Sequence, residues 1–347
     1  MDHGSLVELP RALSAPQPHT DARYVLGVDG GATKTLAAVL DLEGNRLSLG
    51  RGGPSNEDAI GSRAAVQALL GAADEALAAA GVRDGQLGAA VLAIAGTDTE
   101  RLAEGVREAR TDAWIVVNDV VGAWATVTGG GPGVAAIAGT GSNVFGVAGE
   151  GEHARAWRAG GWGHLLGDEG SGYWLGVQSI KAALRHREAS GPATALSAAA
   201  LAFFDEPTVE AVAQSVYSKP LTKGQIAAFA VQTAKLAEQG DAVARELYER
   251  GARKLAEQIK AVIAKIGLAG AEQAFPVGLI GSAYKAGAVF VEPLARFVHE
   301  LAPAAHVERV EMAPVGGSLL LAARACGNAE RLSPAALAPV LARALDD

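Results

Sequence analysis

Residues 118–143 read NDVVGAWATVTGGGPGVAAIAGTGSN, and this stretch holds three features that decide how the chain is organised. The first is an acidic residue, Asp119, at the end of an apolar, strand-like run. The second is a glycine-rich joint, Gly129–Gly133. The third is a second apolar run that breaks into the polar turn Gly139–Asn143. A carboxylate, a joint and a polar glycine turn in this order predict a catalytic cleft between two lobes.

Length and composition place the chain among globular proteins. It has 347 residues, enough for two domains of about 100–200 residues each. Hydrophobic residues make up 49 % of the chain and charged residues 20 %, which is far from a disordered composition. The net charge is −8 and the sequence has no Lys/Arg run, which argues against nucleic acid or an anionic membrane as the main partner.

Cysteine usage and targeting signals favour a cytoplasmic protein. A single cysteine, Cys326, excludes an internal disulfide and a cysteine-rich metal site within one chain. No apolar stretch of about 18–20 residues is present, so no membrane span is expected. Residues 1–22 lack the basic start and apolar core of a signal peptide and are expected to form a flexible tail.

Strand-like and helix-like segments alternate along the chain, a pattern typical of α/β domains. We expect an N-terminal lobe at residues 23–129, completed by a C-terminal helix at 332–347, and a C-terminal lobe at 130–331. The predicted strands are residues 24–28, 36–40, 89–95, 114–117, 134–138, 144–147, 275–280 and 307–312. The predicted helices are residues 61–80, 99–110, 173–187 and 222–239, a long helix capped by Asp241, a helix ending near Cys326, and residues 334–345.

The second half of the chain repeats the sequence pattern with which the first half begins. An apolar strand leads into a Gly/Thr turn and returns as a strand, first around Asp29–Thr35 and again around Gly139–Asn143. This likeness predicts two lobes that begin alike, each presenting a polar glycine turn at a shared cleft. A chance similarity between two short segments is the alternative.

The first of these turns, Asp29-Gly30-Gly31-Ala32-Thr33-Lys34-Thr35, has chemistry that suits phosphate. Its spacing is not that of a P-loop, and it returns as a strand where a dinucleotide-binding turn would open a helix. Glycines let the backbone approach a ligand closely, and Thr33 and Lys34 can donate hydrogen bonds. Asp29 can hold a hydrated Mg²⁺. A simple tight hairpin turn is the other interpretation.

These motifs, with Gly160-Gly-Trp-Gly-His-Leu-Leu-Gly-Asp-Glu-Gly-Ser171 and Gly281-Ser-Ala-Tyr-Lys285, resemble the sugar kinase–actin–heat-shock ATPase superfamily. Within it, the sequence is similar to the BadF/BadG/BcrA/BcrD group that contains N-acetylglucosamine kinases, in consistent order from Tyr24 to Ala325. The resemblance implies two RNase H-like lobes with a cleft between them, a homodimer, and ATP with Mg²⁺ as cofactors. The segment beginning at Gly160 is the longest and most specific match.

The resemblance also implies roles for individual residues. Asp119 matches the catalytic base that takes the proton from a sugar 6-hydroxyl. Substrate-binding roles are implied for Asn56, Gly96, Thr97, Asp119, Gly161, Trp162, Asp168 and Gly172. ATP-binding roles are implied for Gly30, Gly31, Thr33, Lys34, Gly139, Thr140, Gly141, Ser142, Gly281 and Lys285. One departure is that Ala93-Ile94-Ala95 precedes Gly96, where the N-acetylglucosamine kinases carry polar serines, and this puts one sugar contact in doubt.

Each of these residues also has a structural interpretation. Asp119 could be a helix N-cap, Asn56 a turn residue, and Trp162 part of a core. Asp168 and Glu169 could cap the helix that follows them, and Lys34 could be a solvated turn residue. His164 has no second His or Cys at ligand spacing, so we expect it to be structural.

The expected function is ATP-dependent phosphorylation of N-acetyl-D-glucosamine at the 6-hydroxyl, with an amino sugar and ATP as small-molecule partners. Glucosamine, N-acetylmannosamine and N-acetylmuramate remain possible substrates. An ATPase activator of a CoA-ester reductase is a second hypothesis, although such activators carry cysteines for an iron–sulfur cluster. A sugar-responsive regulator is a third, although no helix–turn–helix segment precedes Tyr24.

Overall fold

Strand β1 (Tyr24–Gly30) lies at the centre of a five-stranded mixed sheet with the order β3-β2-β1-β4-β5. It pairs antiparallel with β2 (Thr35–Asp41) and parallel with β4 (Leu87–Ile94). The two edge strands are β3 (Arg46–Gly52), antiparallel to β2, and β5 (Trp114–Asn118), parallel to β4. The apolar run of β1 is buried, as expected for a strand covered on both faces.

The structure is a computed structural model that describes residues 21–31, 33–43, 46–95, 99–110, 114–149, 153–218 and 221–346. It divides into two compact units. The first comprises residues up to 135, residues 145–157 and residues from 310 onward; the second comprises residues 136–144 and 158–309. The predicted N-terminal tail lies outside the described residues, except for Asp21 and Ala22.

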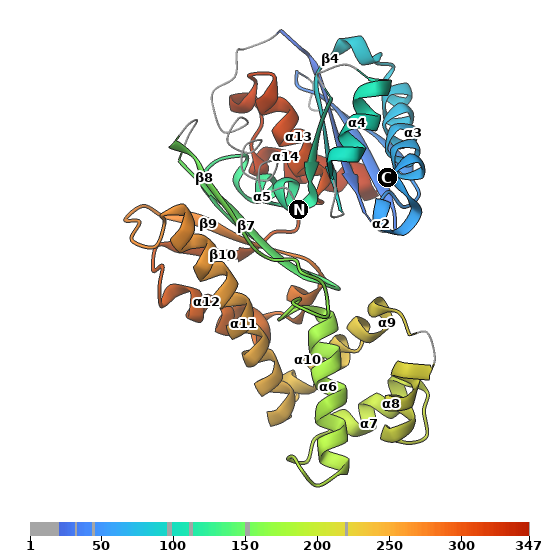
Figure 1. The fold of residues 1–347 in the computed structure, drawn as a ribbon. Helices are drawn as coiled ribbons and strands as arrows, with labels where there is room; N and C mark the ends of the chain where they lie inside the picture. The colour runs from blue at the N-terminus through green and yellow to red at the C-terminus, as the bar shows by residue number, and fades with distance from the viewer. Residues whose placement is uncertain are drawn as a thin grey trace. The chain divides into compact units, whose positions relative to one another are not determined.

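Helices cover both faces of the first sheet (Figure 1). Leu26 and Val28 of β1 point to the face where they share a core cluster with Leu69 and Leu102. Those two leucines belong to α3 (Ser62–Ala80) and α4 (Thr99–Ala109). The other face packs against α5 (Asp119–Thr128), α13 (Val315–Ala325) and α14 (Pro334–Asp346), and the short helix α2 (Glu57–Ile60) precedes α3.

Glycines set the close approach of α13 to the sheet. A β-carbon on Gly27 of β1 would lie 2.7 Å from the Leu319 backbone nitrogen, and one on Gly317 would lie 1.9 Å from the Gly122 carbonyl oxygen of α5. The Ser318 hydroxyl donates a hydrogen bond to the Val28 carbonyl at 2.8 Å. Helix α13, which the sequence prediction grouped with residues 130–331, therefore packs directly on the first strand of the chain.

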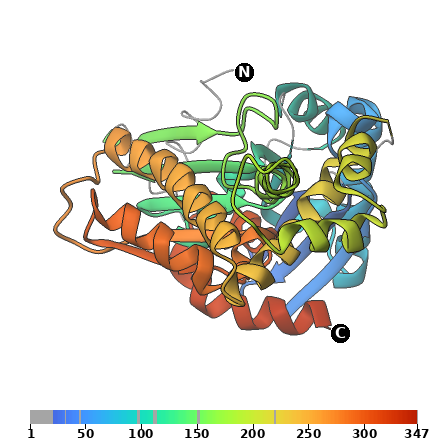
Figure 2. The same cartoon turned by 90° about the horizontal axis from the view of Figure 1, so that it is seen from below.

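A second five-stranded sheet, whose strands β9 and β10 lie wholly in the second unit, has the order β10-β9-β6-β7-β8. Counted along the chain, this is the same third-second-first-fourth-fifth order as in the first sheet, which supports the predicted repeat. Helix α12 (Ala288–His299) packs on β10 and beside the long helix α11 (Ala242–Ile266) (Figure 2). The strands of this sheet are β6 (Gly133–Ala138), β7 (Ser142–Ala148), β8 (Arg155–Gly160), β9 (Phe275–Ile280) and β10 (Ala305–Arg309).

A helical cluster with its own core follows β8 in the chain. Its helices are α6 (Gly172–Arg187), α7 (Leu196–Phe204), α8 (Val209–Ser218), α9 (Lys223–Ala228) and α10 (Ala230–Glu238). Phe229 ends α9 and begins α10, so the single helix predicted at 222–239 is wrong. The core of this cluster contains Leu247 of α11 together with the buried side chains of Ile180, Leu196, Ala200, Val212, Ile226 and Phe229.

The predicted α/β fold class is confirmed, with two five-stranded sheets of one strand order covered by helices. Asp241 accepts a hydrogen bond from the Ala244 N–H at 2.9 Å and caps α11 as predicted. Strands β3 and β8 and helices α7 and α8 were not predicted, and β10 ends before the predicted residues 310–312. Within the described part of the chain, no helix is long and apolar enough to cross a membrane.

The glycine contact between α13 and α5 generates a stability prediction. Gly317→Ala places a methyl group against a backbone carbonyl, so we expect it to lower the free energy of unfolding by roughly 1–3 kcal/mol. Gly71→Ala is the matched control, because Gly71 is an exposed residue within α3 with open space around its β-carbon position. The control should gain roughly 0.5–1 kcal/mol. Equal stability of the two variants in urea denaturation would contradict the packing described.

Candidate active site

The first unit gathers candidate residues at one edge of its sheet. Gly30 lies opposite Ile94, and Ile94 lies opposite Asn118 in the parallel register of β1, β4 and β5. The carboxyl ends of these strands therefore share one edge, and Asp29 and Asp119 both lie at it. This edge is where α/β sheets bind ligands.

Asp119 is the first residue of α5. The N-cap is its neighbour Asn118, whose side chain accepts a hydrogen bond from the Val120 N–H at 3.2 Å. The interpretation of Asp119 as an N-cap is therefore wrong. Its side chain is half-buried, and a carboxylate in the first turn is favoured by the helix dipole.

Asp29 lies half-buried near the end of β1. Burial raises the pKa of this carboxyl from 3.8 to about 6, and the positive charge of Lys34 acts in the opposite direction. Lys34 and Thr33 are both exposed at the tip of the turn, where a ligand can reach them. The carboxylate is thus held poorly solvated near two exposed potential hydrogen-bond donors.

The same turn is bonded to the loop that carries Asn56. The buried Thr35 hydroxyl lies 2.9 Å from the Ser55 hydroxyl and donates to the Gly53 carbonyl at 2.8 Å. The Ser55 N–H donates to the Gly31 carbonyl at 3.0 Å. Half-buried Asn56 follows Ser55 immediately. Neither Thr35 nor Ser55 was predicted to have a role in the site, although both are small hydroxyl residues beside glycine turns.

The residues of this edge fit Mg²⁺ in one specific way. No group of three or more His, Cys, Asp or Glu side chains with metal-site geometry occurs among the described residues. Mg²⁺ keeps most of its waters in nucleotide sites and uses one or two carboxylates together with the phosphates. Asp29 suits that arrangement.

The predicted sugar contacts Gly96 and Thr97 lie outside the described residues.

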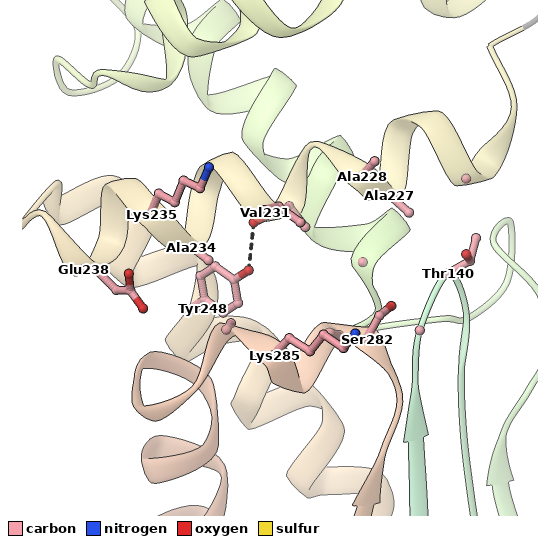
Figure 3. A pocket seen from close by; sticks show the side chains of 16 residues that line it. Thr140, Ala227, Ala228, Val231, Ala234, Lys235, Glu238, Tyr248, Ser282 and Lys285 are labelled. Atoms are coloured by element: carbon pink, nitrogen blue, oxygen red, sulfur yellow. Dashed lines mark hydrogen bonds between the residues drawn. The ribbon is translucent and has the colours of Figure 1, made fainter. Parts of the chain in front are cut away.

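The second unit holds the second glycine turn by backbone hydrogen bonds. The Gly139 N–H donates to the Gly141 carbonyl at 2.9 Å, and the Gly172 N–H donates to the Gly139 carbonyl at 2.8 Å. Gly172 is buried, and its predicted substrate contact remains a prediction. Thr140 lies at the exposed tip of the turn, where a ligand can reach its hydroxyl (Figure 3).

Asp168 is bonded to this turn. One carboxylate oxygen accepts from the Ser142 N–H at 3.1 Å, and the Ser142 hydroxyl donates to the Glu169 carbonyl at 3.0 Å. Asp168 is 8 % exposed and has a positive φ of 61°. Ser171, whose hydroxyl accepts from the Trp174 N–H, caps α6, so the interpretation of Asp168 and Glu169 as helix caps is wrong.

Trp162 lies on the surface with 55 % of its area exposed, so its interpretation as a core residue is wrong. The Arg158 guanidinium lies over the indole ring at 5.7 Å and also donates to the Gly161 carbonyl at 3.3 Å. The His164 ring packs edge-on against Tyr173 at 5.2 Å, consistent with a structural role. An exposed aromatic ring held by a cation can stack on the apolar face of a sugar.

A pocket of about 460 Å³ lies within the second unit. Lys285, Ser282 and Thr140 line it toward one end, and Glu238 lies toward the other, beside Tyr248 (Figure 3). Its walls are lined mainly by small side chains, which suits a flat base. The lining residues are Gly139, Thr140, Gly172, Gly224, Ala227, Ala228, Ala230, Val231, Ala234, Lys235, Glu238, Tyr248, Ser282, Ala283, Lys285 and Ala286.

The structure thus brings together several residues predicted to bind ATP, namely Gly139, Thr140 and Lys285. Gly281, at the end of β9, has a φ of 123°, and a β-carbon there would lie 2.3 Å from the Ala138 carbonyl oxygen. Gly281 is therefore required for the backbone path into this wall. The wall of the pocket formed by α10 was not predicted, although Val231, Ala234 and Glu238 follow helical spacing on one face.

The chain matches a family of ATPases and two kinases of known sequence. Residues 26–322 match the BadF/BadG/BcrA/BcrD ATPase family. The chain is 32 % identical over 246 residues to an N-acetylmuramic acid/N-acetylglucosamine kinase of Clostridium acetobutylicum, covering 70 % of this chain and 79 % of the relative. It is 28 % identical over 315 residues to an N-acetyl-D-glucosamine kinase of Dictyostelium discoideum, covering 86 % of this chain and 97 % of the relative.

Solved structures share the fold. The match to a candidate N-acetylglucosamine kinase from Chromobacterium violaceum has a TM-score of 0.66 at 24 % identity, covering 87 % of this chain and 100 % of that chain. A hexokinase structure matches with a TM-score of 0.54 at 17 % identity, covering 91 % of this chain and 87 % of that chain. At these identities the likeness establishes the fold alone.

The raised pKa of Asp29 generates a prediction about stability. Below pH 3.8 the carboxyl is neutral in the folded and unfolded states, and above about pH 6 it is ionised in both, so its burial cost is complete only above pH 6. Asp29→Asn removes that cost. We expect the variant to be more stable at pH 8, by on the order of 2–3 kcal/mol, and to gain about 1 kcal/mol less at pH 5.

Urea denaturation of both proteins in EDTA at the two pH values measures this effect. Asp74→Asn, which changes an exposed carboxylate of the same unit, serves as the control. A loss of stability at pH 8 in Asp29→Asn would contradict the burial cost assigned to this carboxylate.

Proposed function

The chain belongs to the BadF/BadG/BcrA/BcrD ATPase family, and we propose that it is an ATP-dependent amino-sugar kinase that transfers a phosphoryl group to the 6-hydroxyl of N-acetyl-D-glucosamine. The observation that carries this proposal is the pocket of the second unit, which has nucleotide size, a lysine-bearing end beside the Gly139–Thr140 turn, and small apolar walls. The sugar kinases among its relatives support the acceptor class.

We assign the donor side of the reaction to the glycine turns and Lys285. The γ-phosphoryl passes through a loose transition state, so catalysis depends on positioning and on neutralising charge. Thr33 and Lys34 of the first turn, and Thr140 of the second, donate hydrogen bonds to phosphate oxygens in this proposal. When bound, Mg²⁺ held through water by Asp29 neutralises phosphate charge.

We assign the acceptor side to Asp119, Asn56 and the segment from Gly161 to Asp168. Asp119 accepts the proton of the 6-hydroxyl, and Asn56 binds a neighbouring hydroxyl through its planar amide. Trp162 contacts the apolar face of the ring. A general base of this kind contributes on the order of 10²–10⁴-fold to the rate.

The alternative of an activator for a CoA-ester reductase has less support. Such activators carry cysteines for an iron–sulfur cluster, and this chain has one cysteine in total. That residue, Cys326, is 2 % exposed and lies at the end of α13. The kinase proposal therefore accounts for more of the site.

The choice of sugar is tested by a coupled ADP-release assay. We expect N-acetylglucosamine to give the highest kcat/KM in a panel with glucosamine, N-acetylmannosamine and N-acetylmuramate, and NMR of the product to show phosphate on O6. If another sugar of the panel leads, the substrate assignment changes while the kinase proposal stands. If no sugar raises ADP release above the rate with ATP alone, the kinase proposal fails.

The base assignment is tested by Asp119→Ala. We expect kcat to fall by about 10²-fold or more, with the Kd for an ATP analogue unchanged, because the carboxylate acts on the acceptor. Glu104→Gln, an exposed acid on α4 in the same unit, is the matched control and should retain wild-type kcat. An unchanged kcat in Asp119→Ala refutes the base assignment.

A further inference from the structure

The amide side chains of Gln258 and Asn143 lie against two successive glycines at the start of the segment proposed to bind the sugar. A β-carbon on Gly160 would lie 2.3 Å from Gln258 Oε1, and one on Gly161 would lie 2.7 Å from Asn143 Nδ2. Gly160 and Gly161 have positive φ angles of 79° and 72°. The chain therefore makes a left-handed bend directly against these two side chains, and only glycine fits there.

Gln258 lies on α11 next to the buried residue Ile259 and touches both ends of the loop formed by residues 160–169. Its Oε1 lies against Gly160, and its Nε2 donates to the Glu169 carboxylate at 3.4 Å. One side chain therefore closes the base of the loop that carries Trp162 and Asp168.

The base of the loop is also bonded to the second glycine turn. The Gly161 N–H donates to the Ser142 carbonyl at 3.1 Å, and Asp168 and Glu169 accept from the Ser142 N–H and hydroxyl. These bonds hold the base of the loop against Ser142, the first residue of β7. Gln258 reaches both through Glu169.

Each of the two amides buries an oxygen atom at a cost to the stability of the fold. Gln258 Oε1 and Asn143 Oδ1 are buried and have no hydrogen-bond partner among the residues that the structure describes. An unsatisfied buried acceptor costs roughly 1–3 kcal/mol. A nonpolar side chain of the same length would fill the same space without that cost.

We propose that Gln258 is a positioning residue, which fixes the Gly160–Glu169 loop so that Trp162 and Asp168 are preorganised for the acceptor sugar. This inference rests on the proposed function of that loop. Gln258 touches neither the nucleotide pocket nor any reacting group in the proposed mechanism. Its effect should therefore appear in sugar binding and not in nucleotide binding.

Gln258→Met tests the inference, because methionine keeps the length of the side chain and removes both of its hydrogen-bonding groups. We expect the sugar KM to rise by about 5–20-fold and the ATP KM to change by less than about 2-fold. The melting temperature should stay the same or rise, because a buried unsatisfied oxygen has been removed. Glu257→Gln, an exposed neighbour on the same helix that pairs with Lys254, is the control and should match the wild type.

Hydrogen exchange gives a readout that does not depend on turnover. In Gln258→Met, amides of residues 161–170 should exchange at least about 10-fold faster, while amides in the middle of α6 should be unchanged. A double-mutant cycle with Glu169→Ala should show non-additive effects on exchange, because both changes break the same contact.

The outcomes separate the two proposals. Unchanged exchange in the loop overturns the role of Gln258, whatever the enzyme activity. Faster exchange with an unchanged sugar KM also overturns the positioning role, because the loop would then not govern sugar binding. A wild-type protein that phosphorylates no sugar refutes the proposed function, and the exchange experiment still decides whether Gln258 holds the loop.

Discussion

The hydrogen bond from the Ser142 N–H to the Asp168 carboxylate is the contact on which the second unit's candidate site depends. It joins two segments that are 26 positions apart in sequence and that have different predicted ligands. Ser142 begins the strand after the phosphate turn, and Asp168 ends the loop proposed to bind the sugar. Asp168 is only 8 % exposed, so the surrounding loop restricts the position of its carboxylate. That carboxylate in turn holds the glycine turn in place through Ser142. Hydrogen bonds from backbone N–H groups to a carboxylate are among the stronger ones in proteins, which suits such a joint.

The two sheets share one strand order, and different ligands are proposed for their edges. In both sheets the first and second strands are joined by a polar glycine turn, which is Asp29–Thr35 in the first unit and Gly139–Asn143 in the second. The segment after the fourth strand differs. After β9 it is Gly281 followed by Ser282, and Ser282 lines the pocket of nucleotide size, whereas after β4 it begins at Ala95 and continues into the predicted sugar loop. The repeated fold supplies equivalent edges, and the residues at those edges decide the ligand.

The sequence predicted the features that local patterns encode. Apolar runs ended by glycine marked β1, β4, β6 and β9, and the N-cap at Asp241 marked α11. Asp119 could be singled out because a carboxylate directly follows a buried strand. Strands β3 and β8 were missed because both are edge strands whose sequences mix Arg, Gly and apolar residues without clear alternation. The break between α9 and α10 occurs at Phe229, which is fully buried, so tertiary packing and not a Gly or Pro sets it.

Side-chain partners were beyond the reach of sequence patterns. Nothing local indicates that Thr35 bonds to Ser55, that Asp168 accepts from Ser142, or that Gln258 lies on Gly160, because these contacts join segments 20, 26 and 98 positions apart in the printed sequence. The α10 wall of the pocket was missed for the same reason: Val231 and Glu238 resemble any helix surface until α10 is placed beside Ser282. Glycine turns predict that a ligand binds, but the identity of the second wall requires the fold.

The candidate residues also share an energetic property that a core selected for stability alone would avoid. Asp29 is half-buried and the pKa of its carboxyl is raised to about 6, so at neutral pH the folded chain holds a charge in a poorly solvated position. Asn143 and Gln258 each bury an amide oxygen without a partner among the described residues. Such costs are retained where a group must be ready for a ligand or must hold a neighbour in place. Asp29 fits the first case, because a cation would relieve its charge, and Gln258 fits the second. These energetic costs therefore lie at the first glycine turn and at the base of the Gly160–Glu169 loop, the same regions that the sequence motifs single out.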